Sequence, residues 1–124
     1  MEFKIDTKPT YTVITPESGE LSVNMAEVIR QKVGEATDTG SHNFVINLQH
    51  LTSMNMASGN VLLELHNEVY NNGGSLVFTT LEESVIQTMK KGQYHLSLNL
   101  TPTLIEAIDI INMEVLERDL LGEA

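Results

Sequence analysis

The sequence predicts an α/β domain built around a mixed β-sheet. From Val23 onward, segments with apolar residues at helical spacing alternate with short apolar runs that are typical of buried strands. This order favours parallel strands joined by right-handed helical crossovers. Before Val23, two segments alternate apolar and polar residues, as the strands of a β-hairpin do. The 124 residues contain no linker or repeat, so we expect one domain over residues 1–124.

The N-terminal part predicts a hairpin followed by a helix. Residues 2–6 and 10–15 each alternate with a period of two, and Pro9 separates them. A turn is expected at residues 17–20. From Val23 the apolar residues recur every three or four positions, which predicts an amphipathic helix with one buried face. The residues expected on that face are Ala26, Ile29, Val33 and Ala36.

The middle of the chain predicts one strand–helix–strand unit. The apolar run Phe44-Val45-Ile46 is expected to be a central strand covered on both faces. A loop of small residues follows it, and the next helix is expected to begin at Ala57 or Ser58. The pair Gly73-Gly74 ends that helix, because glycine tolerates the left-handed conformation that a helix C-terminus needs. Leu76-Val77-Phe78 then supplies a second buried strand.

Two more helices are predicted after this unit. The sequence Thr80-Leu81-Glu82-Glu83 has the form of a capping box and predicts a helix that ends near Gly92. Residues 95–100 alternate and indicate a final edge strand. Thr101-Pro102 combines a hydroxyl cap with proline at the first helical position, so a long helix is expected from about residue 102. We expect it to pack back on the domain, with a homodimer as the alternative. The apolar residues of its second half are Met113, Leu116, Leu120 and Leu121.

Composition excludes several classes of partner. The net charge is −10, and only seven basic residues are scattered along the chain. Because phosphate recognition needs clustered lysine and arginine, we expect no nucleic-acid binding, and an anionic membrane surface would repel the domain. No run of about eighteen apolar residues is present, so no membrane insertion is expected. The N-terminal MEFKIDTKP lacks the features of a signal peptide, which predicts a cytoplasmic protein.

The sequence shows no pattern of a metal, cofactor or catalytic site. The chain has no cysteine, and its four histidines are not spaced as a ligand pair on a helix. A phosphate-accepting receiver domain would need carboxylates after the Phe44 strand, where Gln49, His50 and Asn55 stand instead. No serine has a nucleophile motif or a His–Asp partner. We therefore expect no cofactor and no enzymatic activity. The histidines are His42, His50, His66 and His95.

The loop over residues 53–60 has two interpretations. The first is a tight turn in which Met54 packs inward and Asn55 or Ser58 caps the following helix. The second is a protein-binding surface, because the flexible thioether of Met56 beside small residues suits an adaptable contact. The residues that this second interpretation places at the contact are Asn55, Met56, Ala57, Ser58 and Asn60.

Several segments carry a shared order and spacing. They are Gly19-Glu20-Leu21, residues 47–54, residues 61–78 with their glycine pair, and residues 101–107. In this order they resemble the STAS family (sulfate-transporter and anti-sigma-factor-antagonist domains). The resemblance implies the SpoIIAA-like fold, a mixed sheet of four or five strands with helices mainly on one face.

The resemblance also implies a function in bacterial signal transduction and the regulation of transcription. Regulators of this family bind a histidine-kinase-like anti-sigma kinase and release it when a loop serine is phosphorylated. The position of that acceptor is Met56, which cannot be phosphorylated, and the family's aspartate and glycine positions are Asn55 and Ser58. We therefore expect a non-catalytic protein-binding module that works without phosphate. The alternative is the STAS subunit of a lipid-transport ABC complex, whose partner is the ATPase.

Overall fold

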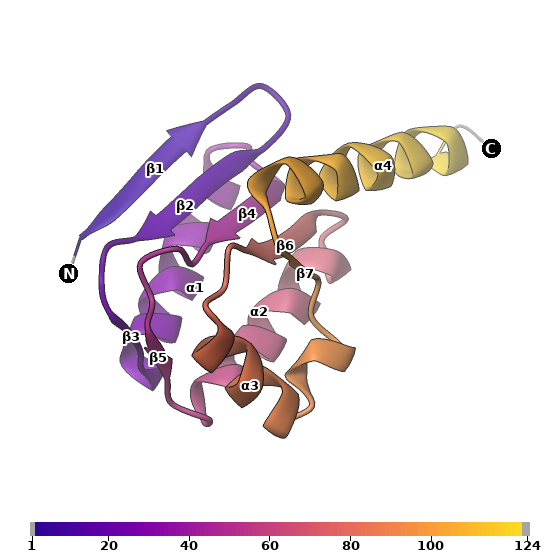
Figure 1. Cartoon of the computed structure of the whole chain (residues 1–124). Coiled ribbons are helices and arrows are strands. Elements are labelled where there is room, and N and C mark those ends of the chain that lie inside the picture. Colours follow the sequence, from indigo (N-terminus) through magenta and orange to yellow (C-terminus); the bar gives the residue numbers. More distant parts are fainter. Residues whose placement is uncertain (1, 123–124) are drawn as a thin grey trace.

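The computed structural model describes residues 2–122 and places a twisted sheet between helices (Figure 1). Of the expected domain, Met1, Glu123 and Ala124 lie outside the described residues. The strands are β1 (Phe3–Thr7), β2 (Thr12–Pro16), β3 (Glu20–Leu21), β4 (Asn43–Asn47), β5 (Ser53–Met54), β6 (Ser75–Thr79) and β7 (Leu100–Thr101). The helices are α1 (Val23–Asp38), α2 (Ser58–Asn71), α3 (Glu83–Lys91), the short 3-10 helix η1 (Tyr94–Leu96) and α4 (Leu104–Gly122).

The main sheet has the strand order β1-β2-β4-β6-β7. β1 is antiparallel to β2 and forms one edge, whereas the other neighbouring strands run parallel. A separate parallel pair joins β3 to β5. The expected mixed sheet with an N-terminal hairpin is therefore confirmed, and it contains five strands.

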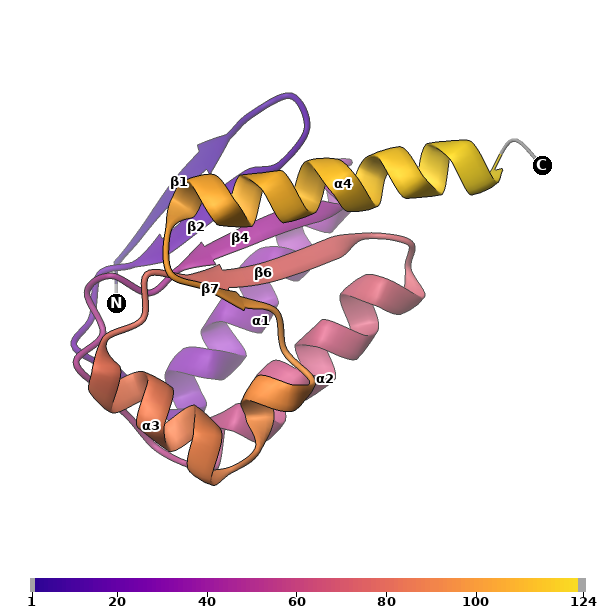
Figure 2. The same cartoon turned by 45° about the vertical axis from the view of Figure 1, so that its right-hand side comes forward.

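The two faces of the sheet carry different side chains because successive residues of a strand point to opposite sides. Ile14, Ile46 and Phe78 are aligned across β2, β4 and β6 on one face, where they join the larger core under α1 and α2. The aligned valines Val13, Val45 and Val77 face the other way, toward α4. Figure 2 shows α4 on that side, opposite α1 and α2. Helices thus lie mainly on one face, as expected.

Helices α1 and α2 are held together at the surface as well as in the core. The guanidinium group of Arg30 on α1 donates to both carboxylate oxygens of Glu68 on α2, at 2.8 and 2.7 Å, and to Glu64 at 3.0 Å. The hydrogen bonds from Arg30 lower the pKa of Glu68. At the start of α1, Ser22 Oγ accepts a hydrogen bond from Met25 N at 3.0 Å, so it caps the helix.

Two local predictions were wrong. α3 begins at Glu83 with Glu82 as its N-cap, and Thr80 has a φ of 58°, so the expected capping box does not form. Thr80 lies too far upstream to reach the first turn. The prediction of a strand over residues 95–100 was also wrong, because η1 and a turn occupy most of that segment and only Leu100 belongs to β7.

The inner side of α4 is packed and anchored. Ala107 and Ile111 are buried against the valine face. Glu114 then accepts hydrogen bonds from the hydroxyl groups of Tyr70 and Ser75 at 2.7 and 2.6 Å. Burial and this carboxylate raise the pKa of Tyr70 to about 12. Arg118 donates to Ser75 Oγ at 2.9 Å, and also to Asn43 Oδ1 at 2.9 Å. Polar groups therefore anchor the helix beside its apolar contacts, which continue to Val115.

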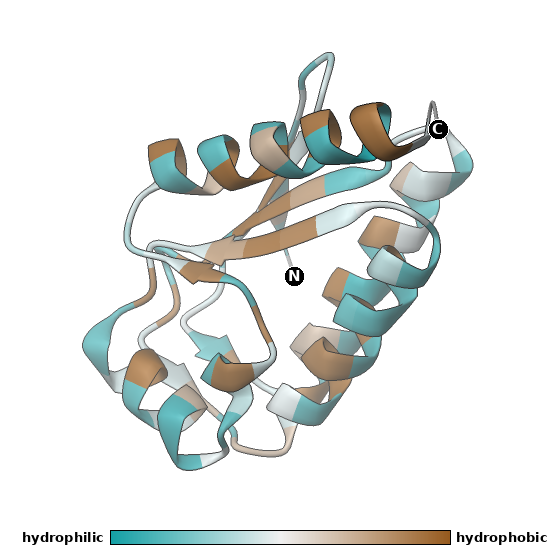
Figure 3. Ribbon diagram, turned by 90° about the vertical axis from the view of Figure 1, so that its right-hand side faces the viewer, coloured by the Kyte–Doolittle hydropathy of each residue, from teal (hydrophilic) through white to brown (hydrophobic). Residues whose placement is uncertain are grey.

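α4 packs back on the domain, as expected, but not through the apolar residues of its second half. Met113, Leu116, Leu120 and Leu121 do not pack back on the domain, since their exposed fractions lie between 59% and 75%. The inward positions are taken by Glu114 and Arg118, and the helix continues past the strands (Figures 1 and 2). Figure 3 shows hydrophobic segments along α4 out to its C-terminal part. Over residues 2–122, no helix combines the length and apolar character needed to cross a bilayer.

Candidate functional site

The loop over residues 53–60 begins from a fixed point. β5 pairs in parallel with β3, with Met54 opposite Leu21. Asn55 N continues this pairing by donating to Leu21 O at 2.9 Å. The side chain of Asn55 then accepts a hydrogen bond from Ala57 N at 2.9 Å, which closes an Asx turn. The direction in which the chain leaves β5 is therefore set by backbone contacts on one side and by Asn55 on the other.

Ser58 has a structural role that differs from the expected contact role. Its side chain is fully buried, and its hydroxyl group donates to Asn55 O at 2.6 Å. The N-cap of α2 is Ala57, and no side chain caps it. Neither Asn55 nor Ser58 therefore caps the helix in the way that the tight-turn interpretation expected. Ser58 instead fastens the turn from inside.

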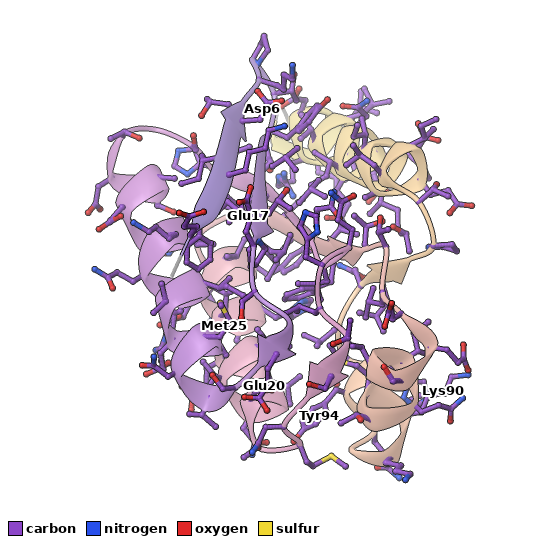
Figure 4. All side chains as sticks on the ribbon, turned by 60° about the vertical axis from the view of Figure 1, so that its left-hand side comes forward. Asp6, Glu17, Glu20, Met25, Lys90 and Tyr94 are labelled. Atoms are coloured by element: carbon purple, nitrogen blue, oxygen red, sulfur yellow. The ribbon has the colours of Figure 1, made fainter. Side chains whose placement is uncertain are left out.

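The buried side chain of Tyr94 packs beneath the loop and holds it by hydrogen bonds. The sequence did not indicate this role. The hydroxyl group of Tyr94 donates to Met56 O at 3.0 Å, and Asn60 Oδ1 lies 3.3 Å away as a second acceptor. The buried ring lies between two glycines. A Cβ atom on Gly59 would come within 2.1 Å of the ring, and one on Gly92 within 2.3 Å. Figure 4 labels Tyr94 at this end of the molecule, below the β3–β5 pair and beside α3.

A signal for Tyr94 was present in the sequence but was too weak to use. Gly59 stands in the first turn of a helix, where glycine is unfavourable unless something needs the space. Gly92 precedes Gln93, which has a φ of 61°, and Tyr94 follows directly. A pair of glycines far apart in the chain points to a close approach by some large group, but the sequence alone does not say which one.

The loop presents an apolar centre to solvent. The Met56 side chain is 41% exposed, and Asn55, Ala57 and Asn60 are exposed around it. Val23 is exposed to the same extent. Because Leu21 is paired with Met54, Val23 and Met56 each follow two residues later and leave the β3–β5 pair at the same end. The sequence did not indicate Val23 as part of this surface.

On its other side the loop meets the end of α3. The sulfur of Met56 lies beside Gly92, since a Cβ atom on that glycine would come within 2.8 Å of it. The residues just before Gly92 are Lys90 and Lys91, which are exposed in the last turn of α3. Cations are favourable at a helix C-terminus, so their placement there has a local cause. The candidate surface thus has an apolar centre and amide groups, and one side of it meets the C-terminal end of α3.

The side chains of the loop are all uncharged. Residues 53–60 offer thioether, methyl, amide and hydroxyl groups and no acid, base or thiol. The group with an unusual environment nearest in sequence is His66, farther along α2. Burial lowers the pKa of His66, and Glu114 partly offsets that effect. Within residues 2–122, no cluster of three histidine or acidic residues could hold a metal ion.

Comparison with known proteins gives a consistent result. The model of the STAS domain family matches residues 3–107. The structure is similar to TM1081 from Thermotoga maritima, with a TM-score of 0.78, 16% identity, and coverage of 89% of this chain and 94% of that one. It is also similar to SpoIIAA, a Bacillus cell fate determinant and anti-sigma factor antagonist, in its unphosphorylated form. There the TM-score is 0.70, with 19% identity and coverage of 90% and 96%.

A membrane protein contains the same kind of domain. The murine anion transporter Slc26a9 matches with a TM-score of 0.64 and 16% identity, over 84% of this chain but only 18% of the transporter. At these identities the likenesses to solved structures show a shared fold alone. They leave the partner to be argued from the surface.

Proposed function

Because the chain belongs to the STAS domain family, we propose that it is a non-catalytic protein-binding module of the anti-sigma-factor-antagonist type. It acts as one domain over residues 1–124 and contacts its partner through the loop at residues 53–60. The contact residues are Asn55, Met56, Ala57 and Asn60, while Ser58 holds the loop from inside. The observation that carries the proposal is the exposure of Met56 on a loop whose backbone is fixed by Tyr94 and Asn55.

A fixed loop favours binding for an entropic reason. Ordering a flexible segment on association lowers affinity, and a segment that is already ordered avoids most of that loss. Here Leu21 O, Asn55 Oδ1 and the Tyr94 hydroxyl group each hold one point of the turn. The methionine at the tip remains adaptable, because its unbranched side chain can take several rotamers against a partner. The surface therefore combines a rigid frame with one deformable contact.

The chemistry of Met56 makes the binding constitutive. In the resemblance to phosphoregulated relatives, this position carries the acceptor hydroxyl group. A phosphate there would add about −1.5 to −2 charges, which an interface built for a neutral side chain cannot accommodate. A thioether cannot be phosphorylated, so the partner is not released by phosphorylation at this position. The partner that fits this reading is a histidine-kinase-like anti-sigma kinase of the bacterial cytoplasm, which places the module in the regulation of transcription.

The same feature supports one alternative. A permanent subunit of a larger complex has no need of release, so a STAS subunit bound to the ATPase of a lipid-transport ABC complex would also lack the acceptor. Purification of the native complex separates the two. An ATPase with its permease supports the transport complex, whereas a sigma-regulating kinase supports the antagonist.

The loop is tested by Met56→Asp. The partner is captured from the source organism, identified by mass spectrometry and purified, and its affinity for each variant is measured by calorimetry. A carboxylate buried at the contact costs several kcal/mol, so we expect at least about a 100-fold loss of affinity. The matched control is Ile5→Asp, an apolar residue of similar exposure on β1 at the far edge of the sheet. Equal affinity for wild type and Met56→Asp would place the contact elsewhere.

A second variant tests the absence of phosphorylation. Met56→Ser restores a hydroxyl group at the acceptor position, so a cognate kinase with ATP should label the variant at residue 56 and leave the wild-type loop unlabelled. The readout is phosphopeptide mass spectrometry. Label on Ser58 of the wild type would contradict the proposal, since that hydroxyl group is buried and bonded to Asn55 O.

A further inference from the structure

The outer side of α4 carries an apolar row that nothing in the domain covers. Ile105, Met113, Leu116 and Leu120 are 59–73% exposed. With about 100° of rotation per residue, these four positions fall on one side of the helix, opposite Ala107 and Ile111, which are buried. We call these four residues the outer row. α4 thus has apolar residues on both sides.

A helix that is apolar on two opposite sides is ordinarily covered on both. The inner side of α4 is covered by the valine face of the sheet, so it accounts for only half of the pattern. Three members of the outer row lie beyond residue 107, where the match to the family model ends. Most of the outer row therefore lies outside the part of the chain that matches the family, so the family fold does not explain why these residues are apolar.

Acidic side chains flank the outer row, and Asp109 lies within it between Ile105 and Met113. Glu106, Asp109, Glu117 and Asp119 are all exposed on α4. The one basic residue of the helix, Arg118, is directed inward, where it donates to Ser75 Oγ, Asn43 Oδ1 and Gly74 O. It therefore does not neutralise the outer side. The exposed surface of α4 combines an apolar stripe with charge of a single sign.

This charge pattern decides between two occupants. A second copy of α4 laid against the row would bring carboxylates against carboxylates, and each chain carries a net charge of −10. Like charges facing each other across an interface oppose association. A helix with an apolar stripe bordered by lysine or arginine meets both requirements, since its stripe covers the row and its cations meet the acids.

We propose that the outer side of α4 binds a cationic amphipathic helix of a partner protein. The contact pairs the outer row with the partner's apolar stripe, and Glu106, Glu117 and Asp119 with its basic residues. The surface lies on the opposite face of the sheet from α1 and α2, and it does not include residues 53–60. Binding here is thus independent of the loop and of the function proposed for it.

The test uses the full chain and two synthetic peptides. One is a fluorescein-labelled 18-residue helix of leucine and lysine with an amphipathic pattern, and the other has glutamate in place of every lysine. Fluorescence anisotropy gives the affinities, and backbone amide shifts locate the contact. We expect the lysine peptide to bind with shifts centred on residues 105–120, and the glutamate peptide not to bind. Leu116→Gln/Leu120→Gln should weaken binding at least about tenfold.

The control variant is Leu96→Gln, which alters another exposed leucine, on η1, and should leave the affinity unchanged. Both variants alter exposed side chains, and circular dichroism verifies that they fold. The proposal is overturned if the double variant binds as tightly as the wild type, or if the shifts lie outside α4. It is also overturned if sedimentation shows a dimer that Leu116→Gln/Leu120→Gln dissociates, because the row would then belong to a second copy.

Discussion

The side chain of Tyr94 determines how well residues 53–60 keep their shape. Its hydroxyl group holds the carbonyl group of Met56 at 3.0 Å, and its ring occupies space that only glycine leaves free at residues 59 and 92. A residue outside the loop thus fixes the conformation of the residue at its tip. Disturbing the ring is therefore expected to affect both stability and partner binding.

Gly59→Ala tests this packing. The new Cβ atom would lie 2.1 Å from the Tyr94 ring, so the ring must move, and we expect a destabilisation of about 1–3 kcal/mol. Gly34→Ala is the matched control, because a Cβ atom on that residue of α1 meets nothing within 4 Å. Alanine is the better helix former there, so it should stabilise by about 0.5–1 kcal/mol. Urea unfolding of both variants measures the difference, and equal changes would show that the ring does not fill this space.

His66 provides a prediction about pH. Burial holds the pKa of its imidazole below the ordinary value of 6.5, and the charge of Glu114 opposes this effect. The neutral form is therefore favoured in the folded protein. The resulting stability is fully present above pH 6.5 and is lost as the pH falls through the lowered pKa of the folded state. His66→Gln should remove this part of the loss when unfolding is measured between about pH 7 and pH 5.

The same histidine tests the position of α4. Glu114→Gln removes the charge that raises the pKa of His66, so the pKa should fall further in this variant. Titration of the imidazole signals by nuclear magnetic resonance gives both values. A pKa that does not change would mean that Glu114 is not held near His66, and so that α4 is not anchored as described.

At the scale of the secondary-structure elements, α4 has two sides with different energetic roles. Ile111 is buried against the valine face, whereas Ile105 on the same helix is 73% exposed. Ile111→Ala should destabilise by about 2–5 kcal/mol, because it leaves a cavity between the helix and the sheet. Ile105→Ala should change stability by no more than about 0.5 kcal/mol. Thermal or urea unfolding measures both, and a similar loss in the two variants would mean that the outer side is covered within the domain.

The elements that the sequence predicts well are those whose pattern repeats. Several residues indicate the same element in the helical spacing from Val23 and in the apolar runs at Phe44 and Leu76. The observed α1, β4 and β6 agree with these predictions. The β3–β5 pair contains only two residues in each strand, too few for a period to appear. The prediction that Thr80 caps α3 was wrong because Thr80 has a left-handed backbone conformation. Such a conformation depends on tertiary contacts, which a four-residue motif does not reveal.

At the scale of the whole molecule, stability is expected to be uneven. β2 and β6 are buried along their whole length between two layers of helices, and β4 is buried from its second residue onward. By contrast, α4 beyond Arg118 has exposed side chains and lies past the strands. Local opening is easiest where few contacts must break. Hydrogen exchange should therefore be slowest in the three central strands and fastest in residues 119–122, and strong protection of those residues in the free protein would contradict this arrangement.

The candidate site could be predicted only in part, for a reason that also belongs to the whole molecule. Met56 was found from its flexible side chain among small residues and from an order of segments that resembles a known family, and both are visible in the sequence. The burial of Ser58, the support from Tyr94 and the nearby exposure of Val23 depend on which segments meet in space. The contacts of Tyr94 with Met56 and of Leu21 with Met54 join residues that are more than 30 positions apart, and no local pattern records them.

The free side of β1 has a consequence for the protein at high concentration. An unpaired strand edge is a template on which further chains can add, and proteins resist this by placing charges along it. β1 carries Lys4 and Asp6, and Asp6 is paired with Lys8 at 3.5 Å just beyond the strand. An incoming strand would have to displace water from these ionic groups. The charges on β1 therefore oppose the addition of a further strand at this edge, which directs association of the domain to its other surfaces.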